Sequence, residues 1–221
     1  MMVFCIWYLL PHLLKKLQIK KLRRLCRCGR LIVLTYDDGP GAHVTRALLD
    51  VLDSHNVKAS FFLLGHKLDV LKENVSQIIS AGHEVGSHSY RHLHAWKNDP
   101  VSMFLDSRKG LHAVRAMAEC RLYRAPYGKV TLGTLIQLWQ AGCKQSWWTI
   151  DSTDTWAKPK AISEILKEIR CQGGGVVLMH DLDRPESPAQ EKLVLDLTQE
   201  LLNLAANEGF RVCKLGEVID K

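Results

Sequence analysis

The sequence predicts an α/β fold, a single domain built as a distorted or incomplete (β/α) barrel with about seven parallel strands. From residue 31 onward, short apolar runs alternate with segments of helical periodicity, and strands buried on both faces of a parallel sheet have this unbroken apolar character. The 221 residues suit one core rather than two. An open doubly wound sheet fits the same pattern, and periodicity alone does not distinguish it from a barrel.

The elements follow in order from run length and from helix-boundary residues. Strands are predicted over 31–36, 59–64, 83–87, 122–124, 145–149, 176–180 and 211–215, and the apolar run is continuous in the first and in 176–180. Helices are predicted where apolar residues recur every three or four positions, over 42–52, 68–81, 100–118, 131–141, 160–170 and 188–207. Pro100 suits a first helical position, and Gly82 and Gly142 suit helix ends. No repeat or linker divides residues 31–221, so we expect one domain there.

Residues 1–30 differ from the rest of the chain in composition, and we treat them as a leader segment. They contain eight basic residues and no acidic one, whereas the remaining residues carry 22 basic and 23 acidic side chains, a net charge of −1. The formal charge of +7 therefore belongs to the leader. Because a nucleic-acid binder needs a basic patch on its folded body, we predict no nucleic-acid partner.

The leader also predicts a location. Its first 14 residues are almost wholly apolar, which is short of the roughly 20 that span a bilayer, and its charge follows the apolar run, unlike that of a secretory signal. Leu10, Leu13, Leu14 and Leu17 fit one helix face, so we expect an anionic membrane surface as a partner, with a solvated tail as the alternative. Seven cysteines without regular spacing favour reduced thiols. We expect a cytoplasmic chain, peripheral on the inner membrane face; a membrane-anchored extracytoplasmic chain is the alternative.

Residues capable of chemistry follow the predicted strands, at the edge where parallel α/β folds form their sites. Asp37 and Asp38 are adjacent carboxylates after the first strand. His88 and His92 are four residues apart, a spacing that would place both imidazoles on one face of a helical turn. Two histidines and one carboxylate with an open position are typical of a catalytic metal site. Each cluster alone also fits a turn or a core histidine.

Five segments, in order, resemble the polysaccharide deacetylases of carbohydrate esterase family 4, which share the NodB-homology domain. The segments are Thr35-Tyr-Asp-Asp-Gly-Pro40, His88-Ser-Tyr-Arg-His92, Arg124-Ala-Pro-Tyr127, Asp151-Ser-Thr-Asp154 and Leu178-Met-His180. They lie within residues 31–215, nearly the whole predicted domain. The family usually has tryptophan directly after the second aspartate of the fourth segment, whereas here Thr155 precedes Trp156. This departure affects the expected wall of the pocket more than the chemistry.

The resemblance implies that Asp38, His88 and His92 hold a divalent metal ion. Zinc is the metal found most often in the family, with Co²⁺, Ni²⁺ or Mn²⁺ as alternatives. The resemblance also implies that Asp37 is the general base, and that Arg124 keeps it ionised and oriented.

The same resemblance implies that His180 is the general acid, with Asp151 positioning it. The backbone N–H of Tyr127 would stabilise the oxyanion. The expected substrate pocket is lined by Leu178, Trp156 and Pro126.

The implied function is that of a metal-dependent hydrolase that removes acetyl groups. The N-acetyl groups of N-acetylglucosamine units in a poly- or oligosaccharide, or in a lipid-linked glycan, are the expected substrate. An O-acetyl esterase or a deformylase would use the same machinery. A non-haem iron oxygenase also uses two histidines and a carboxylate, but Asp37, Arg124 and His180 have no use in that chemistry. A sugar-binding module with an inactive site is a further alternative.

Overall fold

The computed structural model describes residues 2–220, with side chains from residue 10 onward. The first residue of the predicted leader and the last residue of the predicted domain lie outside this range, as does the side chain of Cys5 among the predicted thiols. The strands are β1 (Leu31–Gly39), β2 (Ser60–Leu63), β3 (Glu84–Ser87), β4 (Leu122–Tyr123), β5 (Lys144–Gln145), β6 (Ile150–Asp151), β7 (Gly175–His180) and β8 (Arg211–Val212). The helices are α1 (Met2–Gly29), α2 (Val44–Ser54), α3 (Lys72–Ser80), α4 (Pro100–Arg115), α5 (Leu132–Gln140), α6 (Ile162–Gln172), α7 (Pro188–Glu208) and α8 (Gly216–Ile219), with single turns η1 (Gly65–Lys67) and η2 (Pro126–Gly128).

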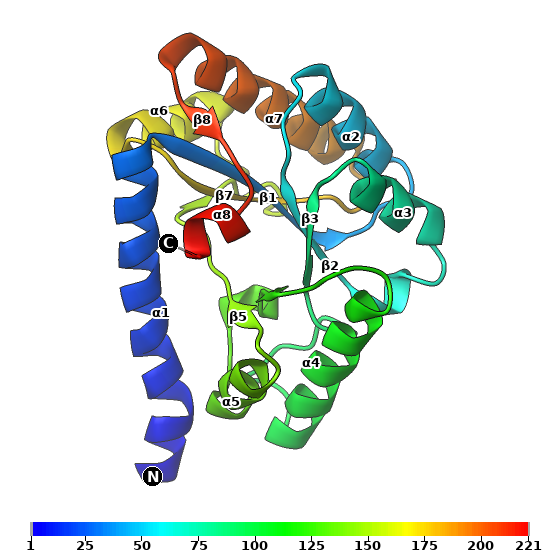
Figure 1. Ribbon diagram of the computed structural model, residues 1–221, viewed down its shortest axis with the longest axis vertical. Helices are drawn as coiled ribbons and strands as arrows, with labels where there is room; N and C mark the ends of the chain where they lie inside the picture. The colour runs from blue at the N-terminus through cyan, green and yellow to red at the C-terminus, as the bar shows by residue number, and fades with distance from the viewer. Residues whose placement is uncertain (1, 221) are drawn as a thin grey trace.

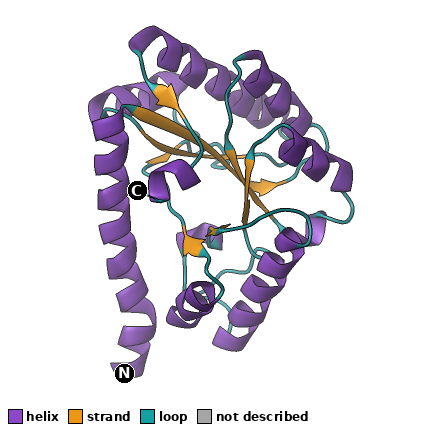
Figure 2. Cartoon of the chain, in the orientation of Figure 1, coloured by secondary structure: helices purple, strands orange, loops and turns teal. Residues whose placement is uncertain are grey.

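The strands form one parallel sheet in the order β5-β4-β3-β2-β1-β7-β6, with β8 paired to the start of β1. β5 and β6 end this path, so the curled sheet is an incomplete barrel, as predicted. The central strands β1, β2 and β7 are almost entirely buried, because helices cover the outside of the sheet (Figure 2). The unbroken apolar runs of the sequence therefore mark the central strands.

The predicted strand over residues 145–149 is wrong. β5 ends at Gln145 and β6 begins at Ile150, so residues 146–149 belong to no strand. Trp147 lies between them, is fully buried and donates a hydrogen bond from its Nε1 atom to Gln18 of α1. The apolar character of this stretch comes from Trp147 and Trp148, and the burial of Trp147 against α1 accounts for it without strand pairing. The predicted helix over 68–81 is likewise shorter, beginning at Lys72 after the turn η1.

The helix α1 runs along one edge of the molecule from the N-terminus to the start of β1 (Figure 1). Its C-terminal half belongs to the core, because Leu22 and Cys26 are buried in the central apolar cluster. Nearer the N-terminus it lies beside α5, and Lys15 Nζ donates a hydrogen bond of 3.0 Å to the carbonyl oxygen of Gly128. None of the helices in the described range is long and apolar enough to cross a membrane.

Candidate active site

The predicted functional residues meet at the carboxyl edge of the sheet. In the parallel pairing of β1 with β7, Asp37 stands opposite His180. Ser87 at the end of β3 stands opposite Tyr123 at the end of β4, so His88 and Arg124 leave the sheet at the same level. Segments separated by up to about 140 residues thus converge at this edge, because all the strands run in the same direction.

Asp38, His88 and His92 form a cluster with the geometry of a metal site. Asp38 Oδ1 lies 3.3 Å from His88 Nε2 and 3.1 Å from His92 Nε2, and the three ligand atoms lie within 4.8 Å of one another. His88 Nδ1 lies 2.8 Å from the carbonyl oxygen of Arg124, to which it donates, so its Nε2 lone pair faces the cluster. Asp38 Oδ1 is buried and has no hydrogen-bond partner. A divalent cation fits an orphaned carboxylate oxygen beside two imidazole nitrogens.

The backbone that brings these ligands together is irregular. The predicted helical turn over 88–92 is wrong, because this segment is a loop in which Ser89 and His92 adopt left-handed conformations, with φ of 71° and 61°. Asp38 is also left-handed, with φ of 68°. Such conformations are uncommon for residues other than glycine and cluster at functional sites. The two histidines therefore converge through loop geometry.

Electrostatics keep His92 suited to binding a metal. Burial, reinforced by the nearby His88, lowers the pKa of His92 to about 4. The imidazole is therefore neutral at physiological pH, the form that ligates metals. Lys67 Nζ donates a 2.8 Å hydrogen bond to the carbonyl oxygen of Asp38 and so holds the ligand-bearing turn. Sequence reasoning missed Lys67, because nothing in its local sequence indicates this contact.

Asp37 and Arg124 form a buried ion pair beside the cluster. Arg124 Nη1 lies 2.8 Å from Asp37 Oδ1 and 2.8 Å from Thr35 Oγ1. Both charged side chains are almost completely inaccessible, and the guanidinium stacks over the ring of Phe62 at 4.1 Å. Asp37 Oδ2 lies 3.8 Å from His88 Nε2. One carboxylate oxygen therefore binds the arginine, and the other lies next to the candidate metal ligands.

We expect Arg124→Met to lower the free energy of unfolding by about 3–5 kcal/mol, because it leaves the carboxylate of Asp37 buried without its partner. Denaturant unfolding followed by circular dichroism measures this loss. The matched control is Arg121→Met, which removes an exposed arginine paired with Glu119 and should cost less than about 1 kcal/mol. Equal effects of the two changes would contradict a special role for the buried pair.

Asp154 positions His180, so the prediction that Asp151 has this role is wrong. His180 Nδ1 lies 2.9 Å from Asp154 Oδ1, whereas Asp151 Oδ1 accepts a hydrogen bond from the backbone of Thr153. Thr153 has a left-handed backbone with φ of 57°. This turn after β6 directs the second aspartate of the segment toward His180 and leaves the first to brace the loop.

The carboxylate of Asp154 is itself held by other side chains. Ser152 Oγ donates to Asp154 Oδ1 at 2.6 Å, and Arg184 Nη2 donates to Asp154 Oδ2 at 3.2 Å. Burial alone would lower the pKa of His180, but the hydrogen bond and negative charge of Asp154 outweigh it and raise that pKa to about 9. His180 is therefore protonated at neutral pH. Sequence reasoning did not find Arg184, which lies outside the five segments.

Asp181 is a buried acid that the sequence analysis did not single out. Its Oδ2 accepts a 2.8 Å hydrogen bond from Thr45 Oγ1, and burial raises its pKa to about 8. It packs so closely on Gly39 that a Cβ there would lie 2.2 Å from its carboxylate oxygens. Glycine is therefore required after the aspartate pair, and Asp181 supports the turn that carries Asp38. The sequence feature that could have identified Asp181 is its position directly after His180.

The predicted pocket residues lie in different environments. Leu178 is buried on β7, and Pro126 is buried at the start of η2. Tyr127 is exposed, has a left-handed backbone with φ of 56°, and its ring centroid lies 4.5 Å from that of His92. Trp156 is 61% exposed in the loop after β6, so its place in a pocket wall stays a prediction, as does the oxyanion role of the Tyr127 backbone.

Comparisons with known proteins agree with this architecture. The family model for polysaccharide deacetylase matches residues 25–146. A chitooligosaccharide deacetylase from Bradyrhizobium sp. (strain ANU 289) is 33% identical over 175 residues, which cover 76% of this chain and 77% of that protein. A solved peptidoglycan N-acetylglucosamine deacetylase matches with a TM-score of 0.77 at 24% identity, over 87% of this chain and 89% of the other. A family 4 pseudoenzyme from Bacillus anthracis matches with a TM-score of 0.71 at 23% identity, over 87% of this chain and 66% of the other. With both a family model and a relative matching most of the domain, the chain belongs to the polysaccharide deacetylase family.

Proposed function

We propose that this chain is a metal-dependent hydrolase that removes acetyl groups from N-acetylglucosamine units of an oligo- or polysaccharide. The observation that carries the proposal is that a candidate general base and a candidate general acid, each held by a charged partner, lie beside one cluster of candidate metal ligands. The Asp37–Arg124 pair adjoins His88, and the Asp154–His180 pair lies at the same edge, where Asp154 raises the pKa of His180 to about 9. Hydrolysis of an amide needs both a base and an acid.

The residues that would hold the metal are Asp38, His88 and His92. This mixed set of imidazole and carboxylate ligands suits zinc, with cobalt, nickel and manganese as the alternatives. A divalent ion bound there would lower the pKa of a coordinated water from about 15.7 toward about 7, which supplies a nucleophile near neutral pH.

The acid–base residues account for the proton transfers of hydrolysis. Asp37 accepts a proton from the attacking water, whose oxygen forms the new bond to the acetyl carbon. Arg124 fixes the orientation of Asp37 by donating a hydrogen bond to its Oδ1 atom. The backbone N–H of Tyr127 donates to the developing oxyanion. His180 gives its proton to the sugar nitrogen as the carbon–nitrogen bond breaks, and acetate leaves.

The substrate class comes from the relatives. The chitooligosaccharide and peptidoglycan deacetylases named above act, by their names, on polymers that contain N-acetylglucosamine. The fold does not by itself guarantee activity, because one structural relative is a pseudoenzyme. The presence of Asp37, Asp38, His88, His92 and His180 together supports a working site in this chain.

An acetate-release assay tests the proposal. The purified chain is incubated with chitin oligomers, peptidoglycan fragments and O-acetylated saccharides, before and after chelation and with add-back of Zn²⁺, Co²⁺, Ni²⁺ or Mn²⁺. We expect acetate from the N-acetylated substrates, loss of at least about 10²-fold on chelation, and recovery with a divalent ion. Acetate from O-acetylated substrates alone would replace the amidase proposal with an esterase. Release that is unaffected by chelation, or no release from any substrate, would overturn the proposal.

A further inference from the structure

An apolar strip runs along the side of α1 that faces away from the core. Leu10, Leu13, Leu14 and Leu17 are all exposed, with Leu17 at 65%. Their spacing of three, four and seven residues places them on one face of an α-helix. The core-facing side of α1 is instead marked by Leu22, which is buried. The docking of α1 on the domain therefore leaves the leucine strip uncovered in this chain.

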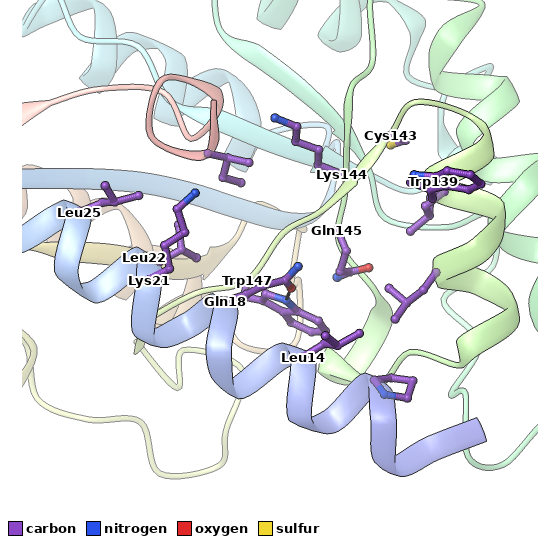
Figure 3. Close-up of a pocket in the computed structure, with 14 residues that line it drawn as sticks. Leu14, Gln18, Lys21, Leu22, Leu25, Trp139, Cys143, Lys144, Gln145 and Trp147 are labelled. Carbon is purple, nitrogen blue, oxygen red and sulfur yellow. Dashed lines mark hydrogen bonds between the residues drawn. The ribbon is translucent and has the colours of Figure 1, made fainter. Parts of the chain in front are cut away.

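The neighbouring helix α5 also carries exposed apolar side chains. Ile136 and Trp139 of that helix are exposed, Trp139 at 80%. Between the two helices lies a cavity of about 580 Å³ whose lining is mainly apolar and includes Leu14 and Trp139. Figure 3 shows Leu14 and Leu22 of α1 on one side of this cavity and Trp139 of α5 on the other. We call the surface formed by Leu10, Leu13, Leu14, Leu17, Ile136 and Trp139 the α1–α5 face.

The charged side chains of α1 beside this face are all basic. Lys16, Lys20, Arg23 and Arg24 are exposed on α1, and the sequence of residues 1–30 contains no acidic residue. The rest of the chain has a net charge of −1, so the positive charge is concentrated on this helix. An exposed apolar surface on a helix whose charged side chains are all basic matches the boundary of an anionic bilayer, where apolar side chains enter the acyl region and cations meet lipid headgroups.

We propose that the α1–α5 face binds the surface of an anionic bilayer, with α1 lying in the membrane plane. The proposal does not depend on the hydrolytic activity. Exposed tryptophan suits such an interface, because the indole ring is amphipathic. Lys15, the residue after Leu14, contacts Gly128 next to Tyr127. This contact lies on the domain-facing side of α1, so a membrane bound at the leucine strip would lie on the opposite side of the helix.

Vesicle flotation of the full chain tests this proposal. We expect the chain to float with vesicles of phosphatidylglycerol and phosphatidylcholine, and to float at least about tenfold less with phosphatidylcholine alone. Leu13→Gln/Leu17→Gln should reduce the bound fraction at low lipid concentration by about tenfold, and Trp139→Gln should also reduce it. The matched control, Val70→Gln/Val101→Gln, alters two apolar residues that are more exposed than Leu13 and Leu17 and lie outside α1 and α5, and it should leave binding unchanged. All of these residues are exposed, so thermal unfolding should match that of the parent chain.

A second pair of variants tests the charge. Lys16→Glu/Lys20→Glu should weaken binding to the anionic vesicles by about tenfold or more, and added salt should have a similar effect. Lys72→Glu/Lys167→Glu changes the net charge equally, on α3 and α6, and should have little effect. Wild-type binding that all these variants retain would overturn the proposal, as would the absence of vesicle binding. Formation of a dimer that Leu13→Gln/Leu17→Gln abolishes, without vesicle binding, would assign the face to a second copy instead.

Discussion

Asp37→Asn is expected to lower kcat for acetate release by about 10²- to 10⁴-fold, the usual contribution of a general base. The amide has nearly the shape of the carboxylate but cannot accept the proton of the attacking water. Its carbonyl oxygen still accepts from Arg124, which lies 2.8 Å from Asp37 Oδ1 in the parent structure. The loss should therefore appear in kcat, while the KM changes less.

Metal content distinguishes the base from the neighbouring ligand. Asp37→Asn leaves Asp38, His88 and His92 intact, so the variant should retain a stoichiometric divalent ion by elemental analysis. Asp38→Asn removes the one anionic ligand of the cluster and should lose both metal and activity. Circular dichroism confirms that each variant is folded. Near-full turnover by Asp37→Asn, or loss of its metal, would contradict the assignment of Asp37 as the base.

Asp154→Asn is expected to lower kcat by about 10²-fold at pH 8. It should also shift the alkaline limb of the pH dependence of kcat to lower pH by at least about one unit. His180 must be protonated to act as the acid, and a histidine is protonated below its pKa. Asp154 raises that pKa to about 9 against the opposing effect of burial. Without the carboxylate charge, burial lowers the pKa, so the acid loses its proton at a lower pH.

Asp151→Asn is the matched control, three residues away and with the same change of charge. Asp151 Oδ1 accepts from the backbone of Thr153, a bond that an asparagine oxygen can also accept. We expect its kcat to stay within about threefold of the parent and its pH profile to keep its alkaline limb. If Asp151→Asn shifts the profile and Asp154→Asn does not, the assignment of Asp154 is wrong.

Much of the site could be predicted because it depends on topology. Once the apolar runs identify parallel strands, the residues after those strands must share one edge. Asp37 and His180 stand opposite each other for this reason, and Arg124 follows the end of β4. The pairing of Arg124 with Asp37 was instead implied by the family resemblance, and the two side chains lie 2.8 Å apart. These contacts do not depend on details of the loops.

The incorrect predictions concern residues whose placement depends on loop conformation. Asp151 and Asp154 are equivalent in sequence, and the left-handed backbone of Thr153 selects the second. The histidine pair converges through a left-handed His92 rather than through helical periodicity. Trp147 is buried against α1, so the apolar character of its segment reflects this burial and not strand pairing. Local composition does not encode these choices, because contacts with distant residues determine them.

The hydrogen bond from Lys15 to Gly128 connects two parts of the chain with different roles. Lys15 precedes the segment that matches the family model, whereas Gly128 lies within it. The adjacent Tyr127 holds a left-handed backbone, a conformation that costs about 1–3 kcal/mol and persists only when its surroundings hold it. A partner that displaces α1 would therefore alter the conformational equilibrium of the turn. Linkage is reciprocal, so a ligand that binds one conformation of the turn more tightly than the other would change the affinity of α1 for that partner by the same factor.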